Sequence, residues 1–428
     1  MPFRISSGRF LSGRFFSGRA GFAFIFITVL LDMLVFGLIS PVLPKLVEEM
    51  LGGDLAYSAK MFGLMGMLWA LMQFVFSPVL GVLSDRFGRR PIILLSNFGL
   101  ALSYVLTAFA LTIALLLVAR VISGITSASF GTANAYIADV TRPEERAAKY
   151  GILGIAFGVG FIAGPALGGI FGNEDPRLPF WIAAGLSALN GLYGLFILPE
   201  SLDKSKRAPL SWRKANPVGS LGLLLSHREL AGLSTSYALS NVGYFVLPSV
   251  FVLYAGHRYG WGAREVGLTL SLVGIATVVA QAGLIKPIVR WLGERRTLIY
   301  GLACGGLGFF IYGWAPAGVF FLIGIPVMAL WGVAGPSEQA LMTSRVSESE
   351  QGQLQGALAA IGGIGGMIGP LVFTSIFAWS ISPGRSFDMP GAAFYVAAGM
   401  QFLALIIVVV STRPRKNDVR VDVENEKI

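Results

Sequence analysis

Two charged residues stand inside long apolar stretches of the sequence. Asp32 lies about eleven residues into the run over residues 21–44, and Arg120 lies inside the run over residues 112–138. A charge at the centre of a bilayer costs roughly 2.5 to 3.5 kcal/mol on insertion scales, so it marks a functional site by default. Because burial favours the neutral form of a carboxyl group, Asp32 is a candidate for reversible protonation. Arg120 can hold a carboxylate ionised or bind an anion. For both, the alternative is a structural role as a packing or pairing partner.

A second group of charges lies where apolar runs end. Asp85 and Arg89 flank Gly88 in one connection, and Asp139 closes a later run. Opposite charges at neighbouring helix ends can latch one side of a protein and release it when helices move. We therefore predict that these four residues form a gate. The alternative is a set of surface charges that only records membrane topology.

Small residues recur along one later run. Gly160, Gly164 and Gly168 are spaced by four, and Pro165 and Gly169 lie among them. Small residues at this spacing share a helix face and allow another helix to approach closely, while a proline bends the helix. The pattern predicts a close helix contact.

Four further residues are candidates for substrate binding: Asn241, Gln281, Tyr237 and Glu338. Asn241 and Gln281 can hydrogen bond a ligand or pair between helices, and Tyr237 suits a hydrophobic ligand. Glu338 lies toward the cytoplasmic end of its run. It is either a substrate or proton site or a residue that reaches the cytoplasmic water.

These residues must be positioned by elements that span a membrane. Of the 428 residues, 54% are hydrophobic and 13% are charged, against about 25% charged in soluble domains. Runs of about 20 apolar residues cross a bilayer as helices, whereas β-barrel strands are shorter and alternate. We predict an all-α membrane protein with twelve transmembrane helices. They cover residues 21–44, 60–83, 91–110, 112–138, 148–172, 180–198, 230–255, 263–286, 297–315, 317–341, 353–379 and 391–411.

The two halves of the chain share features at an offset of 205 residues. Gly164 and Pro165 recur as Gly369 and Pro370, and Gly88 corresponds to Gly293. Parallel repeats of this kind build transporter folds that work by alternating access. The predicted organisation is a basic N-terminal arm (1–20), a six-helix bundle (21–198), a central loop (199–229), a second six-helix bundle (230–411) and a tail (412–428).

The positions of the basic residues predict the orientation and the partners. Most of the 33 Lys and Arg residues lie in the arm, the central loop, the tail and the connections on the same side. The positive-inside rule then places both termini in the cytoplasm, and the net charge of +10 needs no nucleic acid to explain it. We expect the arm to contact anionic membrane lipid, and we expect a monomer that binds a small-molecule substrate.

Enzymatic chemistry finds little support. The chain has one Cys, Cys304, and two His residues, which predicts no disulfide framework and no zinc or iron site. It also lacks a phosphate-binding glycine loop and a nucleophile-base pair. We expect no enzyme activity, no metal and no cofactor, with the proton as the coupling ion.

Several motifs resemble one family. Residues 81–91 (GVLSDRFGRRP) resemble the loop signature of the major facilitator superfamily, and Arg120 with Gly124 resembles its membrane-arginine motif. Residues 160–169 (GFIAGPALGG) resemble the motif of its antiporter branch, and AYIAD (135–139), LPES (198–201) and QGQLQG (351–356) extend the likeness to the tetracycline-efflux type.

The resemblance implies a two-bundle major facilitator fold and a drug/proton antiporter of the bacterial cytoplasmic membrane, active in multidrug efflux and antibiotic resistance. It also implies that Arg89 bridges Asp85 and Asp139, and that Asp32 and Arg120 serve proton coupling. Departures put tetracycline itself in doubt, because positions that carry ionisable groups in those exporters hold Ser103, Thr277 and Gly305 here. The alternatives are a metabolite or siderophore exporter or importer on the same scaffold and, more remotely, a receptor or scaffold that does not transport.

Overall fold

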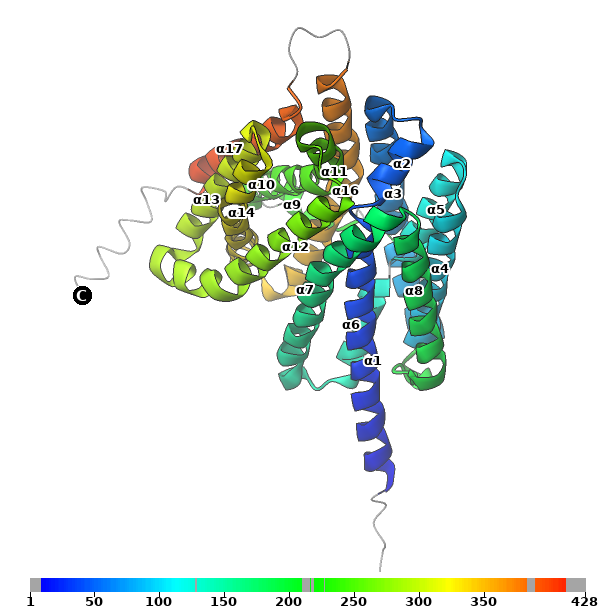
Figure 1. Cartoon of the computed structure of the whole chain (residues 1–428). Helices are drawn as coiled ribbons and strands as arrows, with labels where there is room; N and C mark the ends of the chain where they lie inside the picture. The colour runs from blue at the N-terminus through cyan, green and yellow to red at the C-terminus, as the bar shows by residue number, and fades with distance from the viewer. Residues whose placement is uncertain are drawn as a thin grey trace, which may run out of the picture. The chain divides into compact units, whose positions relative to one another are not determined.

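The computed structural model describes residues 9–127, 129–209, 216, 219–226, 228–382 and 389–412. Within these ranges the chain forms helices joined by turns and contains no β-strand (Figure 1). The all-α prediction is therefore confirmed for this part of the chain. Residues 1–8 of the basic arm, much of 210–218 in the central loop and the tail beyond residue 412 lie outside the described residues, so what was expected of them stays a prediction.

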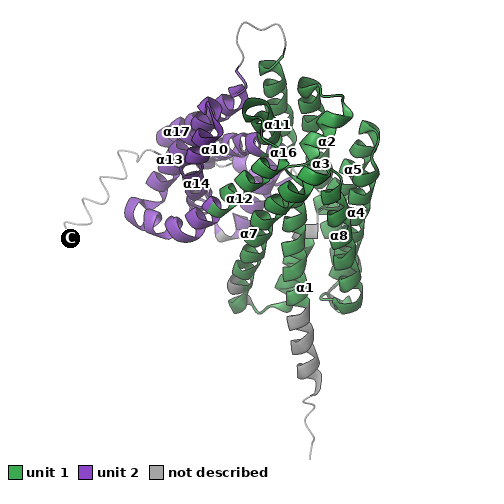
Figure 2. Cartoon of the chain, in the orientation of Figure 1, with its two compact units in different colours: residues 1–217, 248–275, 366–388 green, residues 218–247, 276–365, 389–428 purple. Residues whose placement is uncertain are grey.

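The chain divides into two compact units, coloured green and purple in Figure 2. Unit 1 comprises residues 1–217, 248–275 and 366–388, and unit 2 comprises residues 218–247, 276–365 and 389–428. Unit 1 thus includes two segments that come from the second half of the chain. The predicted boundaries of two six-helix bundles refer to the chain halves and stay a prediction.

The first half of the chain supplies most helices of unit 1. They are α1 (Arg9–Ile39), α2 (Leu43–Met50), α3 (Leu55–Phe87), α4 (Arg89–Phe109), α5 (Ile113–Thr126), α6 (Ser129–Val140), α7 (Pro143–Glu174), α8 (Leu178–Ile197) and the 3-10 turn η1 (Lys204–Lys206).

The second half continues with shorter segments as well as long helices. They are η3 (Gly219–Leu221), α9 (Gly222–Ser226), α10 (Arg228–Tyr244), α11 (Val246–Tyr259), α12 (Ala263–Val279), the π-helical η4 (Ala280–Leu284), α13 (Ile285–Trp314), α14 (Gly318–Ala329), the 3-10 turn η5 (Leu330–Val333), α15 (Ala334–Thr343), η6 (Glu348–Glu350), α16 (Gln351–Ser380) and α17 (Ala392–Ser411). Most of α11 and α12 and the later part of α16 belong to unit 1.

Eleven helical stretches of the described chain are long and apolar enough to cross a membrane. One of them, Ala263–Trp314, has 52 residues and contains two of the predicted runs, 263–286 and 297–315. Two of the twelve predicted spans therefore lie in one helical stretch, and the count of twelve stays a prediction. Gly293 interrupts this stretch locally with a non-helical backbone (φ 72°, ψ 164°).

Local chemistry sets several helix ends in unit 1. The Asp54 carboxylate accepts a hydrogen bond from the Tyr57 backbone N–H at 2.9 Å and caps α3, as capping residues do at helix N-termini. Gly88 separates α3 from α4 with φ 112° and ψ 161°, a region that is essentially limited to glycine. This glycine allows α4 to begin at the residue directly after it.

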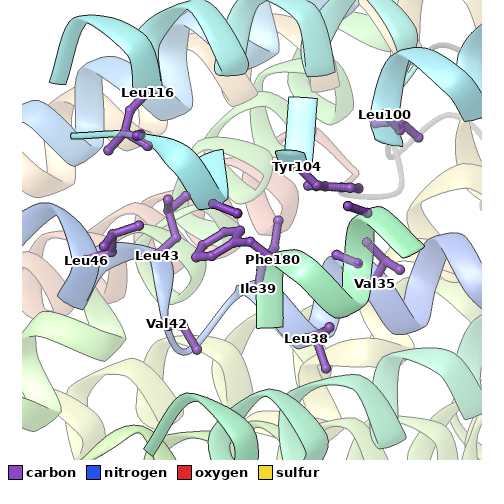
Figure 3. Packing of buried hydrophobic residues seen from close by; sticks show 14 of the residues in the cluster. Val35, Leu38, Ile39, Val42, Leu43, Leu46, Leu100, Tyr104, Leu116 and Phe180 are labelled. Carbon is purple, nitrogen blue, oxygen red and sulfur yellow. The ribbon is translucent and has the colours of Figure 1, made fainter. Parts of the chain in front are cut away.

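A buried apolar cluster joins α1, α2, α3, α4, α5 and α8 in unit 1 (Figure 3). Phe180 of α8 and Leu116 of α5 lie in it together with Val35 of α1. Tyr104 of α4 belongs to the same cluster and is 6% exposed. Because Val35 follows Asp32 by one helical turn, this cluster positions the segment of α1 that carries Asp32.

Candidate functional site

The predicted gate residues come together at the junction of α3 and α4. Arg89 Nη1 donates hydrogen bonds to Asp85 Oδ1 at 2.5 Å and to Ser84 Oγ at 2.6 Å. Arg89 Nε donates to Asp139 Oδ2 at 3.2 Å, which ties α4 to the end of α6. One guanidinium group therefore bridges two carboxylates, as the resemblance implied. This group of contacts is called the latch below.

Sequence reasoning did not assign a role to Glu200, which completes the latch. Its carboxylate accepts hydrogen bonds from the backbone N–H groups of Arg89 at 2.8 Å and Arg90 at 3.3 Å. These are the first residues of α4, so Glu200 caps a helix more than a hundred residues away in sequence. Ser201 Oγ adds a hydrogen bond to Asp139 Oδ2 at 3.1 Å. The available signal was the LPES motif, which was used only as a mark of family likeness.

The glycine motif of α7 makes the predicted close helix contact, and its main partner is α1. A Cβ atom at Gly160 would lie 2.5 Å from the carbonyl oxygen of Leu30, and one at Gly164 would lie 2.8 Å from the Cα atom of Gly37. Gly168 lies equally close to the backbone of Leu38. The stretch of α1 that contains Asp32 therefore rests directly on the α7 backbone, which leaves no room for side chains between them.

Another face of α7 contacts α12 within unit 1. A Cβ atom at Gly169 would lie 2.6 Å from the carbonyl oxygen of Ala263 and 3.1 Å from the Cα atom of Gly267. Ser271 Oγ donates a hydrogen bond to the carbonyl oxygen of Ile162 at 2.6 Å. The α7 motif thus contacts a helix from each half of the chain.

Asp32 and Arg120 are both in unit 1 but are not paired. Neither charge takes part in a salt bridge among the described residues. Arg120 is 8% exposed, and its Nη2 atom is buried without a hydrogen-bond partner, while Asp32 is partly buried. Tyr104 lies within electrostatic range of both charges. A buried tyrosine thus stands near a carboxylate and a guanidinium that form no salt bridge with any described residue.

The four candidate substrate residues are all in unit 2, on three elements. Asn241 Nδ2 donates a hydrogen bond to the carbonyl oxygen of Tyr237 at 3.1 Å, one helical turn earlier on α10. Gln281 lies in the π-helical η4, and a Cβ atom at Gly332 of η5 would be 3.4 Å from its Cγ atom. Glu338 lies on α15, where Tyr237 is within electrostatic range of it.

The structure corrects one interpretation of Glu338. A residue that reached the cytoplasmic water would be exposed, but Glu338 is 2% exposed, and its Oε1 atom is buried without a hydrogen-bond partner. The helical turn that carries it faces inward, because Ala334 and Met342 on the same side of α15 pack with Leu298 and Leu302 of α13. Position near the end of an apolar run does not show which side of a helix faces the protein.

Three irregular helical segments meet in unit 2. The regular helix is interrupted at Phe245 between α10 and α11, at the π-helical η4 and at the 3-10 turn η5. Tyr244 and Trp331 have ring centroids 6.2 Å apart, and Phe309 lies 5.6 Å from Trp331. Departures from α-helical geometry of these kinds often mark hinges and functional sites. Sequence reasoning gave no sign of η4 or η5.

Comparisons with known proteins agree on one family. The model of the Major Facilitator Superfamily matches residues 25–370. Tetracycline resistance protein, class C, of Escherichia coli is 37% identical over 370 residues, which are 86% of this chain and 93% of that protein. Tetracycline resistance protein, class B, of Escherichia coli is 34% identical over 352 residues, which are 82% of this chain and 87% of that protein.

Solved structures give the same fold. The human organic anion transporter MFSD10 (TETRAN) superposes with a TM-score of 0.67 at 25% identity, covering 91% of this chain and 99% of that one. The nucleoside transporter NupG superposes with a TM-score of 0.75 at 15% identity, covering 92% of this chain and 99% of that one. At that identity the second likeness describes the fold alone.

Proposed function

This chain belongs to the major facilitator superfamily and is an integral membrane transporter, and we propose that it uses a proton gradient to export a small amphiphilic compound from the cytoplasm. The proposed membrane is the bacterial cytoplasmic membrane. Relatives named tetracycline resistance proteins support the direction and the class of cargo. A drug is therefore the first cargo to test, and tetracycline is one member of the panel.

The proposed topology has twelve spans with both termini in the cytoplasm. The stretch Ala263–Trp314 would be about 78 Å long as a straight helix at 1.5 Å per residue, far more than one bilayer of about 30 Å. It carries a charged segment with Glu294 and Arg295 next to the non-helical Gly293. We propose that this charged segment lies in cytoplasmic water between two spans.

The observation that carries the proposal is the Asp32 carboxylate. It lies in an apolar helix, has no salt-bridge partner among the described residues, and occupies the part of α1 that rests on the α7 glycines. A carboxylate without a salt-bridge partner can gain and lose a proton. A change of its charge then acts on the α1–α7 contact, in which the two backbones already touch. Asp32 is therefore the proposed coupling residue, with Tyr104 within electrostatic range of it.

Coupling to one proton supplies enough free energy to export cargo against a concentration gradient. One charge that crosses 100 mV is worth about 2.3 kcal/mol. Since about 1.4 kcal/mol corresponds to a factor of ten, one electrogenic proton sustains a cargo gradient of roughly 40-fold. In the proposed cycle the latch fixes the cytoplasmic ends of α3, α4 and α6 in one state and is released in the other.

Everted membrane vesicles provide the test. An inward-acid pH gradient is imposed, and tetracyclines, cationic dyes, other antibiotics and siderophore-like anions are screened for cargo-dependent loss of that gradient. We expect a response in the wild-type protein and none in Asp32→Asn. The matched control is Asp175→Asn, an exposed carboxylate that bonds to the Arg177 backbone, and it should respond as the wild type does. Normal uphill export by Asp32→Asn would refute the assignment.

One observation favours a second candidate, the transport of an organic anion. Arg120 is buried and has no carboxylate partner in the described part of the chain, and a buried guanidinium group suits a carboxylate or phosphate ligand. The human neighbour MFSD10 is named an organic anion transporter. In the same vesicles this candidate predicts a response to anions that Arg120→Gln abolishes, together with silence toward cations.

A further inference from the structure

Glu338 is a buried acid, and no described residue balances its charge. It is 2% exposed, Oε1 has no hydrogen-bond partner, and no salt bridge among the described residues involves it. The apolar cluster around α15 brings Leu298 and Leu302 from α13 and Leu354 from α16. An ionised carboxylate in such surroundings requires a positive partner, and the described protein does not supply one.

The groups that face Glu338 come from α10. Ser236 lies close to its carboxylate, and Tyr237 is a titratable side chain within electrostatic range. The elements packed on the other sides, α13 and α16, present the leucines of the apolar cluster. Among the described residues, no charged side chain lies within electrostatic range of Glu338. Ser236 and Tyr237 are neutral groups, so they do not neutralise an ionised carboxylate.

A line of polar and aromatic side chains leads from Glu338 to the irregular helical segments. Tyr237, Asn241 and Tyr244 follow one face of α10 at helical spacing, and Tyr244 lies beside Trp331. Trp331 precedes Glu338 by seven residues, or about 10 Å along a helix. Since Tyr237 is near Glu338 and Tyr244 is near Trp331, α10 and the η5–α15 segment run side by side over this length.

The aromatic end of this line is exposed, and the irregular helical segments η4 and η5 lie beside it. Tyr244 is 51% exposed, and Gln281 of the π-helical η4 is exposed beside η5. The line of side chains is therefore about 10 Å long. The buried Glu338 lies at one end of it, and the exposed ring of Tyr244 lies at the other end.

We propose that Glu338 is the anionic anchor for an organic cation, whose apolar body lies against Trp331 and Tyr244. This inference rests on the proposed function and names its cargo class. Aromatic faces attract cations, most strongly when water is excluded, and the carboxylate supplies the balancing charge. In the absence of cargo the carboxyl group carries a proton; when the cation binds, this proton leaves to water, so the total charge at the site is unchanged.

Equilibrium binding of tetraphenylphosphonium to the purified full chain tests the proposal without any need for transport. Glu338→Gln should weaken binding at least about tenfold, since removing one partner of a desolvated charge pair is costly. Glu294→Gln, an exposed acid of the same unit, is the matched control and should bind as the wild type does. Glu338→Asp keeps the charge and should retain binding better than Glu338→Gln.

Two more comparisons test separately the effect of the charge of the ligand and the effect of proton competition on binding. Tetraphenylborate has the same shape and the opposite charge, so the wild type should prefer the phosphonium ion and Glu338→Gln should lose that preference. Lowering the pH from about 8 to about 6 should weaken phosphonium binding to the wild type, because proton and cation compete, and should leave Glu338→Gln unchanged. Wild-type affinity in Glu338→Gln, absence of phosphonium binding to the wild type, or equal binding of the two ions would each overturn the inference.

The wild-type chain offers an independent measurement in case Glu338→Gln fails to fold. Dicyclohexylcarbodiimide modifies protonated carboxyl groups in apolar surroundings, and its reaction at Glu338 is followed by peptide mass spectrometry. Tetraphenylphosphonium should slow this reaction and tetraphenylborate should not. Unprotected labelling overturns the inference. Phosphonium binding that depends on Glu338 without gradient-driven export would instead overturn the proposed function alone.

Discussion

The connection between α3 and α4 in unit 1 and the segment within α13 in unit 2 occupy equivalent places in the two chain halves. Gly88 and Gly293, 205 residues apart, have similar backbone angles, with φ 112° and ψ 161° in one and φ 72° and ψ 164° in the other. Both lie in a region that is essentially limited to glycine. The repeat therefore extends from the sequence to the backbone conformation.

The second residue after each glycine is used in the same way. Arg90 Nη2 donates a hydrogen bond to the carbonyl oxygen of Leu195 near the end of α8, and Arg295 Nη2 donates one to that of Val409 near the end of α17. Each guanidinium group thus binds a free carbonyl at the C-terminal end of the last helix of its half, where a positive charge is favourable.

The first residue after each glycine differs. Arg89 bridges Asp85 and Asp139, whereas its counterpart Glu294 is exposed and takes part in no salt bridge among the described residues. The glycine with positive φ and the arginine two residues after it are common to both repeats. Among the described residues, the latch is present in only one of them. The arginine that binds a helix end is thus found in both repeats, while the ion pairs of the latch are found in the first repeat.

Alanine substitutions at Gly88 and Gly293 should distinguish the cost of backbone strain from the cost of a steric contact of the added Cβ atom. Gly293→Ala should lower the free energy of unfolding by about 1 to 2 kcal/mol, through backbone strain alone, because nothing lies within 4 Å of its Cβ position. Gly88→Ala should cost about 1 kcal/mol more than that, because its Cβ would displace the Glu200 carboxylate that caps α4. Thermal unfolding in detergent measures both, and equal losses would show that Glu200 moves away without cost.

Removal of the latch should change turnover more than stability. Arg89→Ala should reduce the transport rate about threefold to tenfold, because two partly exposed charge-assisted hydrogen bonds no longer favour the latched state. Glu294→Ala, at the equivalent position of the other repeat, should leave the rate unchanged. Initial rates in vesicles with matched protein amounts measure this. Unchanged turnover in Arg89→Ala would support the surface-charge interpretation.

The smallest effects are expected where the repeats agree. Arg90→Ala and Arg295→Ala should each lower the free energy of unfolding by about 0.5 to 1 kcal/mol, the usual worth of a hydrogen bond at a helix C-terminus. Transport per folded molecule should stay the same in both. A loss of turnover in only one variant would show that the two arginines do not have equivalent roles.

Apolar runs, basic-residue positions and short motifs were sufficient for much of this protein. Helices cross a membrane because about 20 consecutive apolar residues have no other stable solution in lipid, and the latch was predictable because Asp85, Arg89 and Asp139 lie at helix ends. The glycine contact of α7 followed from spacing alone. In each case the physical cause acts over one helix or one connection and can therefore be read locally.

The remaining features depend on groups that are distant in sequence. Glu200 caps α4 only because the chain after α8 returns to it, and Glu338 is buried rather than wetted because α10, α13 and α16 surround α15. The π-helical and 3-10 segments are compromises between helix geometry and packing. The sequence by itself determined which segments lie in the membrane and where the latch is; only the tertiary structure decided which charges are left without partners, because burial and pairing depend on neighbouring helices.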